Sequence, residues 1–230
     1  EPYSAGGTTT IIGADDAIAI TGALSVNGSN SDTASFTGCL SATSPSGITA
    51  RGTVSASDAA MTIGDADTGI SLSGPLTVTT GGGTLSLGAV NGNAALMLNT
   101  SGGTGAGTFT FDGALGGGTA LASVDITGKG AVALPAITTQ ASGNLTVSAG
   151  GAITDSGIVT VAGNASFTCT LSDATIDLGT LAVAGTIALS TAGSAGNATI
   201  VNGSAINLAV SVVNGSLSAT SPNGITQSGA

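Results

Sequence analysis

The sequence lacks histidine and tryptophan and has only two basic residues among its 230. Without histidine, catalytic triads of the usual kind and histidine-based zinc sites are excluded. Glu1 is the only glutamate, so acid–base catalysis would have to depend on aspartate. Nucleic acids and anionic lipid surfaces are bound by clusters of lysine and arginine, which Arg51 and Lys129 alone cannot form. We therefore expect a protein that is not an enzyme and does not bind nucleic acid.

Charged and aromatic side chains are also scarce. Charged residues make up 6% of the chain and aromatic residues 2%, whereas apolar residues make up 41% and the mean hydropathy is +0.51. Disordered chains have the opposite composition, so this chain should fold. Because aromatic residues are so few, Val, Ile, Leu, Ala and Thr must fill the interior, which favours a thin core.

Long apolar segments are absent. The longest apolar runs, at 131–137 and 205–213, are short or interrupted by polar residues, whereas a membrane helix needs about 18 residues. We therefore expect no membrane insertion. Residues 1–3 lack the basic start and apolar core of a signal peptide, so we expect a mature or excised segment.

Residues 144–168 show the pattern that recurs along the chain. Apolar and hydroxyl residues alternate in 145–148, Gly150-Gly151 interrupts the run, and the alternation returns at 159–161. A period of two, broken every few residues by Gly or Asn, is typical of short strands that bury one face. The same pattern predicts further strands and no helix. The clearest of these are at 17–20, 24–26, 34–37, 70–72, 76–79, 85–87, 96–98, 109–111, 124–126, 132–134, 176–178, 181–183 and 187–189.

Internal repetition narrows the fold. The decapeptide LSATSPSGIT at 40–49 recurs as LSATSPNGIT at 217–226, and the chain stops where a further repeat would begin. Short strands without helices leave a β-solenoid, a pair of sandwiches or a barrel, and repetition favours the solenoid. At roughly 20 residues per coil, we expect about ten coils and a rod on the order of 50 Å long. No linker composition appears, so we predict a single domain over 1–230, with 1–14 as a lead strand or linker.

Two acidic residues are the only candidate metal ligands. The segment that runs from Asp65 through Asp67 to Gly69 resembles half of a calcium loop, but it lacks the third oxygen position and the closing Glu. The alternatives are a turn and a calcium site. No other cofactor is expected.

The two cysteines occupy matching places in the repeats. Cys39 and Cys169 each follow a Phe-Thr pair. They are far apart in the sequence, so the alternatives are buried free thiols or a disulfide within or between chains.

The repeats resemble those of filamentous-haemagglutinin-like and autotransporter-type adhesins of Gram-negative bacteria. The similarity rests on the phrases NLTVSAGGAITDSG at 144–157 and IVTVAGNASFT at 158–168, with related phrases at 88–96, 111–117 and 119–124. It implies a right-handed parallel β-helix, export to the cell surface, and a role in adhesion or surface structure. Such repeats are usually poor in cysteine, so the two cysteines are a departure.

We therefore expect a non-enzymatic structural or adhesive segment of an extracellular bacterial protein. Its expected partners are copies of itself or further repeats stacked end to end, since a solenoid coil exposes backbone groups at its ends; a host or neighbouring cell surface is left open. The alternative is a ligand-binding solenoid. Threonine rows such as Leu76–Thr80 favour ice, but no regular Thr-x-Thr series is evident, and glycan binding usually needs more aromatic residues than this chain has.

Overall fold

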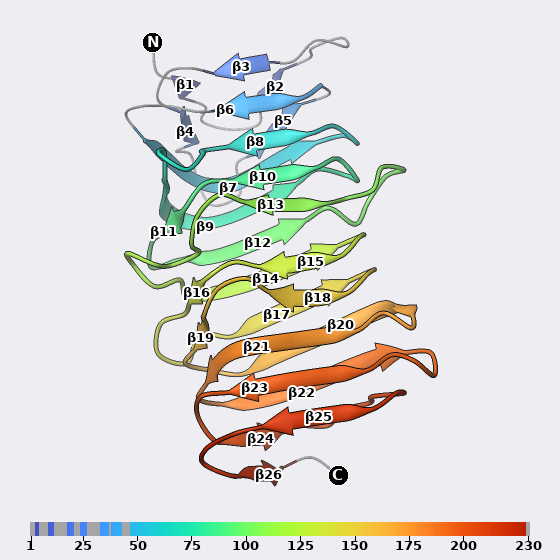
Figure 1. Cartoon of the computed structure of the whole chain (residues 1–230). Coiled ribbons are helices and arrows are strands. Elements are labelled where there is room, and N and C mark those ends of the chain that lie inside the picture. Colours follow the sequence, from blue (N-terminus) through green and yellow to red (C-terminus); the bar gives the residue numbers. More distant parts are fainter. Residues whose placement is uncertain are drawn as a thin grey trace. The chain divides into compact units, whose positions relative to one another are not determined.

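The computed structural model describes residues 3–4, 9–11, 18–20, 24–26, 33–36, 38–42 and 47–228. Within these ranges there is no helix, and so none that is long and apolar enough to cross a membrane. The strands pair in parallel and stack as a β-solenoid of about nine turns, which confirms the predicted fold class and comes close to the expected coil number (Figure 1). Of the lead predicted at 1–14, only Tyr3–Ser4 and Thr9–Ile11 are described, as short strands.

The chain divides into two compact units, Glu1–Leu121 and Ala122–Ala230. Each unit is a stack of coils with its own inward-facing side chains. The single domain over 1–230 stays a prediction.

Unit 1 contains three columns of paired strands. One column is the five-stranded sheet in the order β13-β10-β8-β6-β3, and the others run β2-β5-β7-β9-β12 and β1-β4-β7-β9-β11. The strands are β1 (Tyr3–Ser4), β2 (Thr9–Ile11), β3 (Ile18–Ile20), β4 (Leu24–Val26), β5 (Thr33–Phe36), β6 (Leu40–Ala42), β7 (Ile48–Ala56), β8 (Met61–Ile63), β9 (Ile70–Thr79), β10 (Leu85–Leu87), β11 (Val90–Asn91), β12 (Ala95–Asn99) and β13 (Phe109–Phe111).

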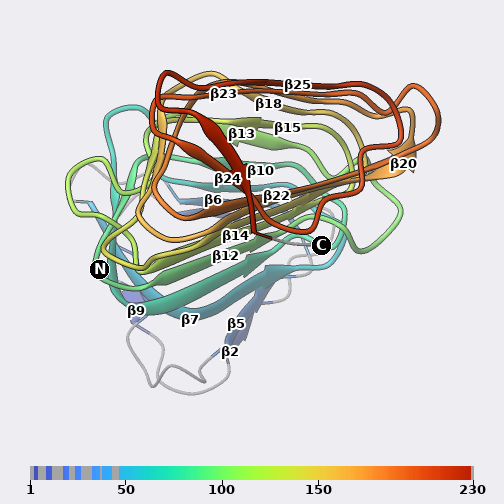
Figure 2. The same ribbon diagram turned by 90° about the horizontal axis from the view of Figure 1, so that it is seen from below.

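Unit 2 repeats this arrangement with the columns β15-β18-β21-β23-β25, β14-β17-β20-β22-β24-β26 and β16-β19-β21. Seen from below, β23 and β25 lie on one side of the coil and β22 on the other (Figure 2). The strands are β14 (Ser123–Gly128), β15 (Val132–Leu134), β16 (Ile137–Thr138), β17 (Leu145–Ala149), β18 (Ile153–Asp155), β19 (Val159–Val161), β20 (Ala165–Ser172), β21 (Ile176–Val183), β22 (Thr186–Ala192), β23 (Ala198–Asn202), β24 (Ile206–Leu208), β25 (Leu217–Thr220) and β26 (Ile225–Gln227).

The core is a set of in-register columns of apolar side chains. In unit 2 one column is Ile126, Val147, Phe167 and Leu189, which belong to four successive coils and are all buried. The residues between them along each strand point outward, because side chains alternate faces in a strand. Each inward Val, Leu, Ile or Phe contributes on the order of 1.5–3 kcal/mol through burial.

Two predicted breaks between strands are absent, one in β9 and one in β21, which runs unbroken over the strands predicted at 176–178 and 181–183. The sequence predicts separate strands at 70–72 and 76–79, whereas β9 runs unbroken through Pro75. The ladder between β7 and β9 shifts register between Ala50 and Gly52. Such an irregularity bends a strand without ending it, so β7 and β9 each turn a corner of the coil as one element.

Candidate interaction surfaces

Asp65 belongs to a tight turn. Its carboxylate Oδ1 accepts hydrogen bonds from the backbone N–H groups of Asp67, at 2.9 Å, and Thr68, at 2.7 Å. The Asp65 N–H in turn donates to the Thr68 carbonyl at 3.1 Å. An aspartate that binds its own backbone in this way favours turns. Of the two alternatives for this segment, the geometry is that of the turn, and no group of three or more His, Cys, Asp or Glu side chains in the described ranges could hold a metal ion.

The two cysteines are free thiols with different surroundings. Cys169 is buried, and burial raises the pKa of its thiol, opposed in part by a hydrogen bond with the Ile153 backbone. Cys39 is exposed, so of the two alternatives that of a buried free thiol is wrong for this residue. Cys39 lies outside the strands, between β5 and β6, whereas Cys169 lies within β20 at an inward position.

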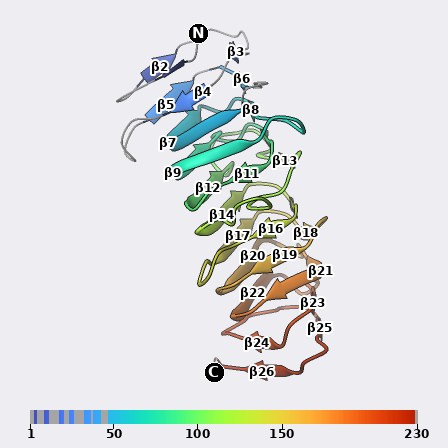
Figure 3. The same cartoon turned by 90° about the vertical axis from the view of Figure 1, so that its left-hand side faces the viewer.

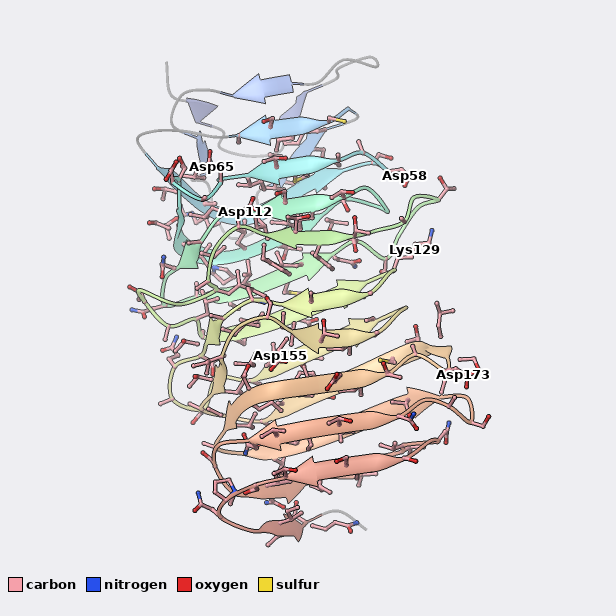
Figure 4. The ribbon with its side chains drawn as sticks, viewed as in Figure 1. Asp58, Asp65, Asp112, Lys129, Asp155 and Asp173 are labelled. Carbon is pink, nitrogen blue, oxygen red and sulfur yellow. The ribbon has the colours of Figure 1, made fainter. Side chains whose placement is uncertain are left out.

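The Asp58 side chain connects two turns that are far apart in the sequence. Its Oδ2 accepts hydrogen bonds from the Thr104 N–H, at 2.9 Å, and the Thr104 hydroxyl, and its Oδ1 accepts one from Gly105 N–H at 3.0 Å. Asp58 lies between β7 and β8, whereas Thr104 lies between β12 and β13. Figure 4 shows Asp58 and Asp65 at opposite edges of unit 1, at the turns. The Asp58 side chain therefore binds one turn to another.

Aspartate carboxylates also connect coils in unit 2. The Asp155 carboxylate accepts hydrogen bonds from the backbone N–H groups of Gly179, at 2.9 Å, and Thr180, at 2.7 Å, as well as from the Thr180 hydroxyl at 2.7 Å. The Asp173 Oδ1 accepts one from Ala195 N–H at 2.9 Å. In Figure 4, Asp173 lies at the right-hand edge of unit 2, whereas Asp155 lies to its left, at the end of β18. These carboxylates therefore connect successive coils.

Asparagine side chains form a further connection at the corners of unit 2. The Asn144 Oδ1 accepts a hydrogen bond from Asn164 N–H at 2.8 Å, and Asn164 Oδ1 accepts one from Thr186 N–H at 2.9 Å. Asn197 Oδ1 accepts one from Ser216 N–H at 2.7 Å. Each amide carbonyl thus satisfies a backbone donor in the coil that follows.

The outward face of β5, β7, β9 and β12 in unit 1 carries two columns of side chains that are polar except for Met97. The first column runs Thr33, Thr53, Thr77 and Met97, and the second runs Ser35, Ser55, Thr79 and Asn99. The hydroxyls of Ser35 and Ser55 are hydrogen-bonded at 3.0 Å. Neighbouring strands are about 4.8 Å apart, so each column repeats at that spacing.

A comparable face occurs on β14, β17, β20 and β22 of unit 2. Its columns are Asp125, Thr146, Ser166 and Ala188, and Thr127, Ser148, Thr168 and Ser190. Partial burial raises the pKa of the Asp125 carboxyl. These columns were missed from the sequence, which shows no regular Thr-x-Thr series, because serine replaces threonine and the spacing between coils varies. In unit 1, for example, 20 residues separate Ser35 from Ser55 and 24 separate Ser55 from Thr79.

The strands β25 and β26 expose side chains of the kind that the other coils bury. Leu217 pairs in register with the buried Ala198, and Ile225 with the buried Ile206, yet Leu217 is 42% exposed and Ile225 is 49% exposed. Among the described strands, β25 pairs only with β23 and β26 only with β24, and β26 is the outermost strand of its column (Figure 3). We call Leu217, Ala219 and Ile225 the end surface.

A family described as repeats of unknown function (DUF5649) matches residues 121–169 and 195–230. These segments include the end surface and much of the repeat pattern of unit 2. No curated protein and no solved structure matches the chain. The chain is therefore similar, over these two segments, to a family of repeats.

Proposed function

We propose that the chain is a non-enzymatic structural and adhesive segment of a secreted bacterial surface protein of the filamentous-haemagglutinin or autotransporter type, and that it assembles end to end into an extracellular filament. The observation that carries the proposal is the set of hydrogen bonds that polar side chains of this chain make between coils. Several polar side chains accept hydrogen bonds from backbone groups of other coils, namely those of Asp58, Asp155, Asp173, Asn144, Asn164 and Asn197. These hydrogen bonds stabilise the stack of coils, as a structural role requires.

The filament version of the proposal assigns another copy of this chain as the cover of the end surface, although a further coil of a longer chain would cover the same residues. A solenoid edge has unpaired backbone groups and apolar side chains, and both favour the addition of another strand layer. A contact that does not close on itself produces an open filament.

Electron microscopy of the protein in its native state, with mass analysis of intact and reduced samples, tests the proposal. We expect regular filaments that contain one kind of subunit. Isolated particles at every protein concentration would contradict end-to-end assembly. A reduced mass well below the intact mass would identify chains that are joined by disulfides.

Ice binding is a second candidate, because the hydroxyl columns form a regular array on one face of unit 1. Rigid rows of threonine hydroxyl and methyl groups at a fixed spacing can order water as a crystal face does. The test is thermal hysteresis of the freezing point in the presence of seed ice. Thr53→Lys with Thr77→Lys should abolish a hysteresis that depends on this face, whereas Thr62→Lys, on the outward side of β8, should leave it unchanged. Absence of hysteresis in the unmodified protein would exclude this candidate.

A further inference from the structure

Unit 2 contains several copies of the tripeptide Asn-x-Ser/Thr, none with proline at the middle position. In secreted proteins this tripeptide accepts an N-linked sugar, which is joined to the asparagine Nδ2. The asparagines are Asn144, Asn164, Asn197, Asn202 and Asn214. The motif is the same in all of them, so the structure must distinguish them, and it does so by the partners of Nδ2.

Three of these asparagines have an Nδ2 that is free to react. Asn144, Asn164 and Asn197 are exposed, and each stands directly before a strand, β17, β20 or β23. Their Oδ1 atoms accept hydrogen bonds from backbone N–H groups of the next coil, but within residues 122–228 none of the three Nδ2 groups makes a hydrogen bond. A sugar on Nδ2 leaves the Oδ1 carbonyl in place, so the bonds between coils would survive the modification.

The packing of these three amides follows one pattern. A glycine of the next coil lies so close to each Oδ1 that an added Cβ would collide with it. The pairs are Asn144 with Gly163, Asn164 with Gly185, and Asn197 with Gly215. Because Oδ1 and Nδ2 are on opposite sides of the planar amide group, an Oδ1 held against the next coil leaves Nδ2 pointing away from it.

The hydroxyl residue of each tripeptide lies on the same face as its asparagine. Side chains alternate in a strand, so residues two apart share a face. The outward hydroxyl residues are Thr146, Ser166 and Thr199, and the buried residues that precede them are Leu145, Ala165 and Ala198. An enzyme that binds the outward face therefore meets the amide and the hydroxyl together, without unfolding the strand.

The Nδ2 of Asn202 is in use, in contrast to these three. Asn202 is fully buried, and its Nδ2 donates to the carbonyls of Val183, at 3.1 Å, and Ala205, at 2.9 Å. Both N–H groups of this amide are therefore occupied, and a sugar would have to enter the core. The Nδ2 of Asn214 donates to the Thr191 carbonyl at 3.0 Å, and this residue is not part of the assignment.

We propose that Asn144, Asn164 and Asn197 are glycosylated on Nδ2 in the cells that produce this protein, and that Asn202 is not. A bond forms between Nδ2 and the anomeric carbon of a nucleotide-activated monosaccharide, and the bond from that carbon to the diphosphate breaks. The nucleoside diphosphate leaves, and a base of the transferring enzyme accepts one Nδ2 proton. The inference goes beyond the proposed function, since neither filament assembly nor ice binding requires a sugar.

The spacing of the asparagines favours a small sugar. Leu145 and Ala165 are opposite each other in the ladder between β17 and β20, and neighbouring strands lie about 4.8 Å apart. Asn144 and Asn164, which precede these two residues, are therefore one strand spacing apart. Two sugars attached at that separation lie side by side, which suits a single monosaccharide at each site better than a branched oligosaccharide.

Mass spectrometry of peptides from the protein isolated from its producing cells tests the assignment. A protease of broad specificity is needed, because the chain has only two basic residues. We expect the mass of one monosaccharide at Asn144, Asn164 and Asn197 and none at Asn202. Three unmodified asparagines would overturn the proposal, and so would a sugar on Asn202 to the same extent, because the motif alone would then select the site. A preassembled oligosaccharide at Asn144 and Asn164 would overturn the choice of donor.

Variants made in the same cells test the role of the outward hydroxyl. Ser166→Ala should remove the sugar from Asn164 and leave it on Asn144 and Asn197. The matched control is Thr168→Ala, which removes a hydroxyl from the same outward face of β20 but belongs to no tripeptide of this kind, so all three sugars should remain. Circular dichroism should be the same for both variants and the unmodified chain, which separates loss of the sugar from loss of the fold. A sugar that persists on Asn164 in Ser166→Ala, or that is lost in Thr168→Ala, would overturn the proposal.

Discussion

Asn202 offers a sharp test of how the coils of unit 2 are held together. It lies at the end of β23 in an inward position, in register with Leu181, and it is fully buried. Its Oδ1 accepts a hydrogen bond from Val183 N–H at 2.8 Å, and its Nδ2 donates to the carbonyls of Val183, at 3.1 Å, and Ala205, at 2.9 Å. A single amide thus satisfies three backbone groups.

The substitution Asn202→Leu sets two effects against each other. Leucine at this inward position would gain about 2 kcal/mol from apolar burial. The lost amide leaves one buried N–H and two buried carbonyls without their partner, at about 1–3 kcal/mol for each group that finds no other. The penalty for three groups is about 3–9 kcal/mol, which exceeds the gain even at its lower end, so we expect a net destabilisation of about 1–7 kcal/mol.

Urea unfolding followed by circular dichroism measures this difference as a change in the free energy of unfolding. Thr199→Leu is the control, because Thr199 lies on the same strand with an outward, exposed side chain. The control should change stability by less than about 0.5 kcal/mol. If Asn202→Leu were as stable as the unmodified chain, the hydrogen bonds of Asn202 would not be holding the coil, and the reasoning would fail.

Three further substitutions or treatments have definite expected outcomes. Gly82→Ala should cost about 1–3 kcal/mol in urea unfolding, because Gly82 has φ of +120° and an added Cβ would lie 2.5 Å from Asp58 Oδ1; unchanged stability would contradict this. Burial raises the pKa of Asp125, so its charged form is a cost above the folded-state pKa, and stability rises as pH falls through that value. Asp125→Asn should therefore stabilise the chain at pH 7 and lose this advantage once pH falls below the usual aspartate pKa, as unfolding curves at several pH values would show. A maleimide should label Cys39 in the folded chain and Cys169 only after unfolding, which mass spectrometry of the labelled peptides checks; early labelling of Cys169 would show that its coil is open.

Strand positions could be predicted because they depend on local alternation. Leu145 and Val147 point inward and Thr146 outward, as the period of two requires, and the glycine pair that follows Ala149 ends β17. Most inward residues of the described strands are aliphatic, so the pattern is strong in these strands. The parallel solenoid could be predicted because internal repeats favour stacked coils over other all-β folds.

The turns and surfaces could not be predicted because they depend on the register between coils. The bond from Asp58 to Thr104 spans 46 residues, and no local pattern relates the two. Asn202 looks like one more turn asparagine in the sequence, yet it replaces an aliphatic residue in a buried column. The exposure of Cys39 was not predicted because this residue lies between β5 and β6, and similarity of the flanking repeat does not show where a strand ends.

The coils differ in length but still pack in register, because the strands are regular and only the turns between them vary. The register places Ser35, Ser55 and Thr79 in one column although the intervals between them differ, so the extra residues must lie in turns and bends. A turn of variable length leaves backbone donors that the next coil does not meet in a fixed place, and a side-chain carboxylate or amide can reach them where a backbone carbonyl cannot. Asp155 at the end of β18 and Asn164 between β19 and β20 each accept backbone hydrogen bonds from the next coil, so stacking alone gives these two side chains a role.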